Sequence, residues 1–164
     1  MKVLLVNGSP HEKGCTYTAL REVAGELERL GVESEILWLG ASPVADCKDC
    51  GACRKLKKCV IDDTVNEVLE RADTIDGFVF GSPVYYATAS GQLLSFMDRL
   101  FFAGSRKLRK KPAAAVVSCR RGGASAAFDT INKYFMMSSM PVVTSQYWNQ
   151  VHGFKPEEVL QDTE

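Results

Sequence analysis

Four of the six cysteines lie in one short stretch, DCKDCGACRKLKKCVIDD, at residues 46–63. They are Cys47, Cys50, Cys53 and Cys59. Cysteines that only fill space in a core have no reason to cluster in the sequence, so this stretch indicates chemistry. Four thiols at this spacing fit a metal or iron–sulfur cage, a redox-active disulfide, or a loop of free thiols.

The overall charge limits the classes of partner that we expect. Twenty basic residues balance twenty acidic ones, so no net field attracts nucleic acid or an anionic membrane, and we expect neither as a partner. The apolar run in MKVLLVNGSP is too short for a signal peptide or a spanning helix, which predicts a cytoplasmic protein. In a reducing compartment, closely spaced cysteines are more often metal ligands or redox-active thiols than structural disulfides.

The elements that must position these residues alternate along the chain. Continuous apolar runs predict strands at 2–7, 32–39, 75–83, 113–118 and 141–148. Apolar stripes at helical spacing predict helices within 19–30, 65–72, 93–101 and 128–135, the second opened by a capping box from Thr64 to Glu67. Apolar strands that alternate with helices predict a doubly wound α/β fold with a five-stranded parallel sheet and helices on both faces. We expect a single domain over 1–164, with a cysteine-rich loop at 40–61.

One helix is missing from this pattern. After the fifth predicted strand only PEEVLQDTE, near the end of the chain, has helical character, and it is too short to cover the sheet beside the first helix. Either the chain is longer or a partner covers the gap. Because a soluble monomer seldom exposes such an apolar face, we expect a homo-oligomer, either a homodimer or a homotetramer.

Ligands of open α/β sheets bind at the carboxyl ends of the strands, so the loops there should carry the chemistry. The first is NGSPHEKGCTYT, residues 7–18. It matches neither of the common dinucleotide and triphosphate motifs. Its hydroxyls, with the backbone amides of a helix start, can hold a phosphate monoester. The same residues could instead only form the turn and cap the helix.

Two further loops could hold a flat ring. In GSPVYYATASGQL, Tyr85 and Tyr86 suit an aromatic ligand, although they could equally be partly exposed packing residues. In SCRRGGAS, Gly122 and Gly123 allow a ligand to approach the backbone, and Arg120 could stabilise a ring that becomes anionic on reduction. A phosphate loop, an aromatic loop and a cationic glycine loop at one edge are what a flavin mononucleotide (FMN) needs.

With these three loops, the chain resembles the flavodoxin-like NAD(P)H-dependent FMN reductase superfamily, and specifically the cysteine-containing branch that includes the iron-sulfur flavoproteins. The resemblance runs over nearly the whole chain and implies a flavodoxin-like fold with noncovalent FMN. It implies electron transfer from NAD(P)H or a ferredoxin-type protein donor to an unidentified acceptor. The flavin itself would carry the chemistry, so no catalytic side chain is assigned.

The resemblance also assigns FMN contacts by motif. The phosphate and ribityl chain would be held by Ser9, Pro10, Thr16, Tyr17 and Thr18. The isoalloxazine would be lined by Pro83, Val84, Tyr85 and Tyr86. Its pyrimidine edge would meet Ser118, Arg120, Gly122 and Gly123. Cys15 stands where relatives often have a small polar residue, so only its backbone amide is expected to help.

In the iron-sulfur flavoproteins, a CxxCxxC run followed by a fourth cysteine binds a 4Fe-4S cluster, and Cys47, Cys50, Cys53 and Cys59 reproduce that spacing. The resemblance therefore implies that these four are cluster ligands, in a loop that folds back near the carboxyl edge of the sheet. A loop of free thiols over the flavin or a dimer interface, a zinc site and a disulfide remain alternatives.

Taken together, the sequence predicts an FMN-dependent oxidoreductase that transfers electrons from NAD(P)H or a reduced protein to a small-molecule or protein acceptor, with or without a cluster. The alternative is a non-enzymatic electron carrier of the flavodoxin or ferredoxin kind.

Overall fold

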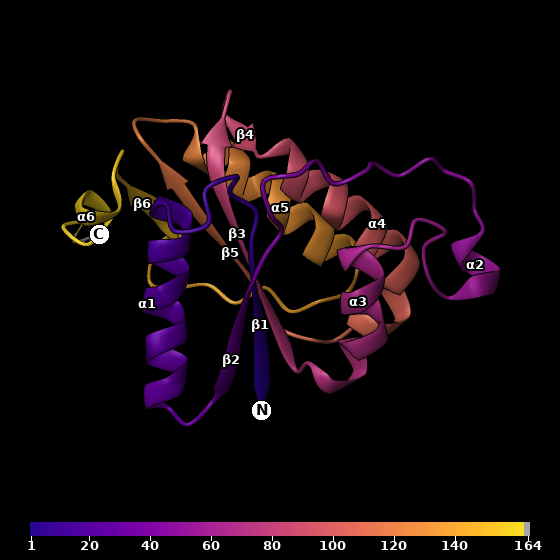
Figure 1. Ribbon diagram of the computed structural model, residues 1–164. Helices are drawn as coiled ribbons and strands as arrows, with labels where there is room; N and C mark the ends of the chain where they lie inside the picture. Colours follow the sequence, from indigo (N-terminus) through magenta and orange to yellow (C-terminus); the bar gives the residue numbers. More distant parts are fainter. Residues whose placement is uncertain (163–164) are drawn as a thin grey trace.

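Five parallel strands form the central sheet of the computed structural model, which describes residues 1–162 (Figure 1). They are β1 (Lys2–Asn7), β2 (Glu33–Trp38), β3 (Gly77–Tyr85), β5 (Ala113–Cys119) and β6 (Gln150–His152). Their order in the sheet is β2-β1-β3-β5-β6, and each neighbouring pair is parallel. A sixth, short strand, β4 (Thr88–Ala89), pairs antiparallel with the end of β3. The predicted doubly wound five-stranded sheet is confirmed.

Helices lie on both faces of the sheet. They are α1 (Cys15–Arg29), α2 (Cys53–Leu56), α3 (Thr64–Arg71), the 3-10 helix η1 (Ala72–Thr74), α4 (Gly91–Leu108), α5 (Ala124–Met137) and α6 (Pro156–Val159). Figure 1 shows α1 and the short α6 on one side of the sheet, and α3, α4 and α5 together on the other. Because the chain goes from β1 to β2 on one side and then to β3 on the other, the strand order reverses between β1 and β3. This is the switch point at which such folds bind ligands.

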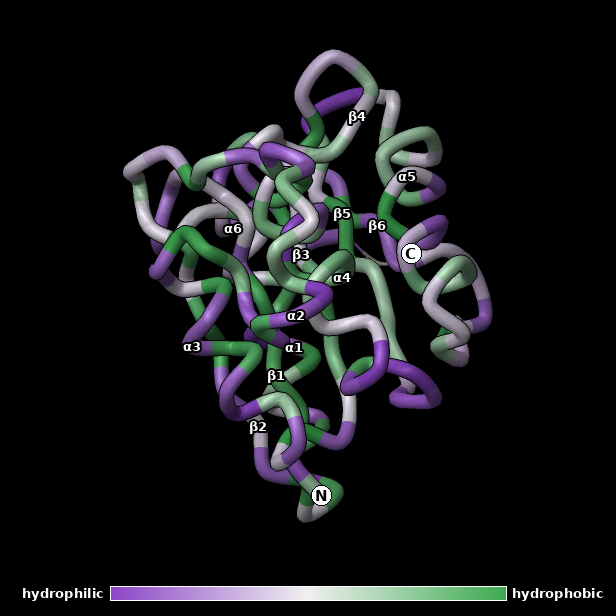
Figure 2. Tube along the Cα trace, turned by 90° about the vertical axis from the view of Figure 1, so that its right-hand side faces the viewer, coloured by the Kyte–Doolittle hydropathy of each residue, from purple (hydrophilic) through white to green (hydrophobic). Residues whose placement is uncertain are grey.

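The strands are apolar on both faces because each face packs on helices. In β1, Leu4 and Val6 belong to the large core under α3, α4 and α5, whereas Val3 and Leu5 belong to a smaller core under α1. Figure 2 shows the hydrophobic stretches running along the strands. In the larger core, the Phe80 ring lies 5.5 Å from Phe135, measured between ring centroids. The two cores differ greatly in size.

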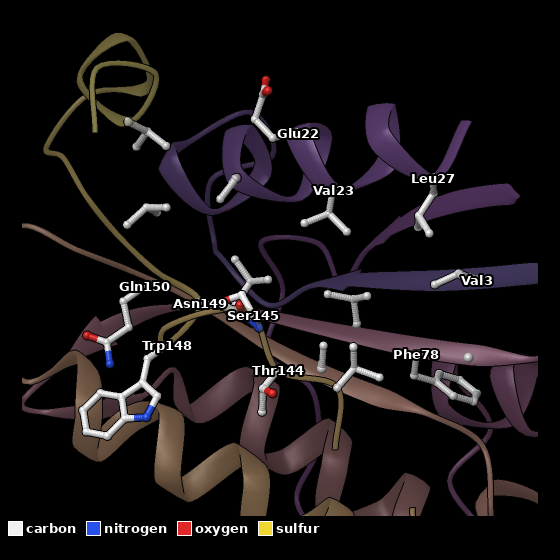
Figure 3. A pocket seen from close by; sticks show the side chains of 18 of the residues that line it. Val3, Glu22, Val23, Leu27, Phe78, Thr144, Ser145, Trp148, Asn149 and Gln150 are labelled. Carbon is white, nitrogen blue, oxygen red and sulfur yellow. The ribbon is translucent and has the colours of Figure 1, made fainter. Parts of the chain in front are cut away.

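The face that carries α1 is only partly covered. In the part of the chain that the structure describes, α1 and the short α6 are the helices of this face, and a groove of about 640 Å³ lies beside them. Figure 3 shows Val23 and Leu27 of α1 above this groove, with Val3 of the sheet and Trp148 of the segment before β6 along it. The prediction that this face lacks a second long helix is confirmed for residues 1–162.

The last strand differs from the prediction. The segment 141–148 was expected to be a strand, but it makes only an isolated bridge between Val142 and Ala113. The strand that completes the sheet is β6, which pairs with Val117–Cys119 of β5. An edge strand pairs on one side only, so apolar composition alone does not fix where it forms. In this case Trp148 leaves the sheet edge and stacks on Phe128 of α5, with 6.3 Å between ring centroids.

The start of α3 also differs. Its N-cap is Asp63, whose carboxylate accepts a hydrogen bond from the backbone N–H of Val65 at 3.1 Å. The predicted capping box from Thr64 to Glu67 is therefore wrong by one residue, because aspartate caps a helix at least as well as threonine. None of the helices within residues 1–162 combines the length and the hydrophobicity needed to cross a membrane.

Candidate functional site

The loop after β1 is shaped by a buried asparagine. The Asn7 amide donates to the carbonyl of Glu12 at 3.1 Å, and its Oδ1 accepts from the backbone N–H of Ser9 at 3.1 Å. These two hydrogen bonds close the loop on itself. The Ser9 hydroxyl oxygen in turn accepts from the N–H of His11 at 3.1 Å, which leaves the hydroxyl proton of Ser9 free for a ligand.

The same loop is pressed against the switch point of the sheet. The N–H of Gly8 donates to the carbonyl of Gly81 in β3 at 2.9 Å. A Cβ atom at Gly8 would lie 2.6 Å from Cβ of Leu93, so no side chain fits at this position. Ser90, the N-cap of α4, donates its hydroxyl to the carbonyl of Gly8 at 2.6 Å. The loop is thus fixed to both β3 and α4.

The N-terminus of α1 faces this loop without a capping side chain. The N-cap is Gly14, and within residues 1–162 no side chain caps this helix start and no acidic residue lies in its first turn. The first N–H groups of a helix have no partner within the helix, and their partial positive charge favours an anion. Of the alternative roles, Ser9 does contribute to the turn through its contact with His11 and Gly14 is the N-cap, but no serine or threonine side chain caps the start of α1.

A pocket of about 710 Å³ lies over this helix start and the ends of the strands. Of the residues predicted to bind FMN, those that line it are Ser9, Pro10, Thr16, Pro83, Val84, Tyr85, Ser118 and Arg120. Two of them, from different loops, meet directly: the hydroxyl oxygens of Thr16 and Ser118 are 2.8 Å apart. The three loops that the sequence singled out therefore converge on one cavity.

Five predicted contacts do not line this pocket: Tyr17, Thr18, Tyr86, Gly122 and Gly123. Tyr17 lines a smaller neighbouring pocket, and the Thr18 hydroxyl donates to the carbonyl of Gly14 at 3.2 Å. Gly122 is exposed.

The loop between β3 and β4 makes a strained turn. Tyr86 and Ala87 both have positive φ, 49° and 58°, a conformation that usually requires glycine or asparagine. Gly123, with φ 86°, lies against this turn, and a Cβ atom there would be 2.8 Å from Cα of Ala87. Gly123 therefore allows the third loop to support the second, and Tyr86 projects fully into solvent at the tip of the turn.

Two aromatic residues of the pocket were not predicted from the sequence. Trp38 donates its indole N–H to the carbonyl of Ser9 at 2.9 Å. The guanidinium carbon of Arg120 lies over the ring of Phe154, 4.4 Å from the ring centroid. Trp38 ends a strand at the same sheet edge, so its position near the pocket could have been predicted from the sequence. Phe154 had no such signal, because the preceding strand was misplaced.

Cys15 also lines the pocket, with its thiol 3.7 Å from the carbonyl of Gly153. Burial raises the pKa of this thiol above its ordinary value. The side chain is therefore a neutral thiol at neutral pH, and it brings no negative charge next to the helix start.

The four clustered cysteines share a second, smaller pocket of about 30 Å³. Cys47, Cys50, Cys53 and Cys59 all line it, and all are free thiols. Within residues 1–162, no group of three or more His, Cys, Asp or Glu side chains is arranged to hold a metal ion. The four cysteines thus border one small pocket, but in the described residues they do not form a metal-binding group.

This second pocket lies to the side of the sheet. The loop that follows β2 is held along the start of α4, where the Gln92 amide donates to the carbonyls of Leu39 and Gly40 at 3.2 and 2.8 Å. Figure 1 shows α2 beyond α3 and α4, away from the strand ends. At Cys59 the chain is tied to α3, because the N–H of Cys59 donates to the Asn66 side chain at 2.8 Å.

The fold and the pocket at its carboxyl edge define a flavodoxin-like α/β protein, and comparison with known proteins agrees. The sequence matches the NADPH-dependent FMN reductase family over residues 1–155, and the chain belongs to that family. An iron-sulfur flavoprotein of Methanocaldococcus jannaschii is 34% identical over 146 residues, which are 87% of this chain and 76% of that protein.

Solved structures share the fold at lower identity. A NAD(P)H:quinone oxidoreductase from Methanothermobacter marburgensis superposes with a TM-score of 0.72 at 16% identity, covering 95% of this chain and 86% of the other. A flavodoxin from the domain Archaea gives a TM-score of 0.66 at 16% identity, covering 98% and 90%. At these identities the likeness establishes the flavodoxin-like fold alone.

Proposed function

We propose that this protein is a cytoplasmic FMN-dependent oxidoreductase that takes electrons from NAD(P)H or a ferredoxin-type donor and passes them to a small-molecule or protein acceptor. One observation carries the proposal: the uncapped start of α1 opens into the pocket where the three predicted loops meet. When bound, FMN supplies the redox chemistry, and the protein supplies binding, orientation and electrostatics.

The phosphate end of the ligand fits the loop after β1. The Ser9 hydroxyl has a free proton, and the first N–H groups of α1 point to the same space. Both are donors, which is what a phosphate monoester needs. The neutral thiol of Cys15 does not oppose this charge. The backbone of the loop is held by Asn7, so these donors are in place before a ligand arrives.

The ring end of the ligand fits the other two loops. Pro83, Val84 and Tyr85 provide an apolar and aromatic wall at the end of β3. Arg120 lies on the opposite loop, and its stacking on Phe154 orients its guanidinium at the pocket. A cation at this place would stabilise a reduced, anionic flavin ring.

We also propose that Cys47, Cys50, Cys53 and Cys59 hold a 4Fe-4S cluster. The support is the donor set, four free thiols that line one pocket, together with the name iron-sulfur flavoprotein, which several relatives carry. Five basic residues of the loop would offset the charge of an anionic cluster. They are Lys48, Arg54, Lys55, Lys57 and Lys58.

A homo-oligomer, either a dimer or a tetramer, is proposed from the partly covered face. The groove beside α1 is lined mainly by apolar side chains, among them Val23, Leu27 and Val116. Contiguous apolar surface of this kind usually marks an interaction site in a soluble protein.

The first test compares two ligands. Replacing Ser9 and Thr16 together by alanine should raise the Kd of FMN roughly a hundredfold, because two hydrogen bonds to a charged group are lost. The affinity for riboflavin, which lacks the phosphate, should change far less. Isothermal titration or flavin-fluorescence quenching measures both. Thr18→Ala, a hydroxyl of the same helix outside the pocket lining, is the matched control, and equal losses for FMN and riboflavin would count against the phosphate assignment.

The second test separates an enzyme from a non-enzymatic electron carrier, which is the competing function. An oxidoreductase should show steady-state NAD(P)H oxidation with a quinone or ferricyanide as acceptor, saturable in both substrates. Reduction of bound FMN by a protein donor, without turnover on any small acceptor, would instead favour a carrier.

The third test concerns the cluster. Anaerobic reconstitution with iron and sulfide should give about four irons per chain, with a broad visible absorption that is distinct from that of flavin, and each single Cys→Ser variant of the four should lose most of that iron. Cys119→Ser, a buried cysteine outside this pocket, should retain it. Iron retention no higher than in the quadruple serine variant would leave a loop of free thiols.

The fourth test concerns assembly. Multi-angle light scattering at micromolar concentration should give a dimer or tetramer mass, and Leu27→Glu in the groove should lower that mass. The exposed Leu30→Glu of the same helix end, which does not line the groove, is the control. A monomer mass for the unchanged chain would contradict the proposal.

A further inference from the structure

The cysteine pocket contains a buried cation that the sequence reasoning did not consider. Arg99 lies in the middle of α4, and only 1% of its surface is exposed. It lines the same pocket as the four cysteines. Burying a guanidinium costs free energy unless each of its N–H groups has a hydrogen-bond partner. The partners of Arg99 therefore indicate its role.

Its partners come from both ends of the cysteine loop. Nη1 and Nη2 donate to the two carboxylate oxygens of Asp63 at 2.6 and 2.9 Å, a paired contact that fixes the plane of the guanidinium. Nη1 also donates to the carbonyl of Ala45 at 3.2 Å, and Nη2 to that of Ile61 at 2.9 Å. The remaining donor, Nε, points at the sulfur of Cys59, 3.3 Å away.

These contacts join segments that are distant in the sequence. Ala45 stands just before the first cysteine of the loop, and Ile61 just after the last. Asp63 is the N-cap of α3. One side chain of α4 therefore closes the loop at both ends and ties it to the start of the next helix.

The contact with sulfur goes beyond loop closure. A second arginine, Arg71, pairs with a carboxylate but contacts no cysteine in these hydrogen bonds: its Nη1 lies 2.7 Å from each carboxylate oxygen of Glu35. By comparison, Arg99 contacts the two oxygens of Asp63 with two different nitrogens, and in addition it directs its Nε–H at a cysteine of the proposed cage.

We propose that Arg99 is a positioning residue of the cysteine site, which closes the loop and donates an N–H hydrogen bond to the Cys59 sulfur. The second half of this proposal rests on the proposed cluster. A hydrogen bond to a ligand sulfur withdraws electron density from the cluster and raises its reduction potential. The first half concerns the protein alone and holds whether or not a metal is bound.

The loop-closing role is tested on protein free of metal. Arg99→Lys keeps the positive charge but cannot reproduce a forked set of five contacts. The rate at which iodoacetamide alkylates Cys59, followed by mass spectrometry of the peptides, should rise by about tenfold or more, because the loop opens more often. Arg71→Lys, which alters an arginine–carboxylate pair away from the loop, should leave that rate unchanged.

Asp63→Asn gives a second, independent measurement if Arg99→Lys does not fold. Asparagine still caps α3, but the charged partner of Arg99 is gone, so alkylation of Cys59 should again accelerate. An unchanged rate in every folded variant of this pair would overturn the proposal that Arg99 closes the loop.

The sulfur contact is tested on reconstituted protein. Relative to the unchanged chain and to Arg71→Lys, Arg99→Lys should shift the cluster potential to more negative values in a spectroelectrochemical titration, because charge is kept while the N–H···S contact is lost. An identical potential would overturn this half. If the unchanged chain takes up no iron, the proposed cluster fails, while the alkylation rates still decide whether Arg99 closes the loop.

Discussion

The tight contact between Gly8 and β3 is the constraint on which the site depends. The N–H of Gly8 donates to the carbonyl of Gly81, and Leu93 lies so close that Gly8 has no room for a side chain. Because the loop is held this close to the sheet, α1 begins directly above the ends of β1 and β3, and its unpaired N–H groups open into the pocket. The third loop reaches the same pocket through Ser118, whose hydroxyl contacts that of Thr16.

The two faces of the sheet differ in how completely they are covered. The face under α3, α4 and α5 contains the larger core, with phenylalanine rings from β3, α4 and α5 in contact. The other face has a small core under α1 and leaves a groove next to it. Most of the buried apolar side chains thus lie on one side. The uncovered apolar groove lies on the other, and the FMN pocket proposed here opens at the edge between them.

The fold was predictable because its signals are local and repeated. Apolar strands such as β1 and amphipathic helices such as α1 are read directly from periodicity. The loops at the switch point were found for the same reason, since turn residues follow each buried strand. The prediction of a strand at 141–148 was wrong because the pairing of an edge strand depends on its neighbours and not on composition.

What could not be predicted depends on long-range contacts. Arg99 reads as an ordinary charge on a helix, but it is buried because Asp63 and Cys59, some forty residues earlier in the chain, supply its partners. The lining role of Phe154 likewise follows from its contact with Arg120, on a different loop. No spacing rule reports such pairs, so a single sequence locates the loops at the strand ends but not the residues that hold them.

The two pockets are joined by one continuous helix. Ser90, at the start of α4, holds the loop of the first pocket, and Arg99 holds the loop of the second. A helix advances about 1.5 Å per residue, so these two anchors lie roughly 13 to 14 Å apart along its axis. Since α4 packs into the larger core along its length, it acts as a rigid spacer. The separation of the two anchors is therefore set by the helix and not by either loop.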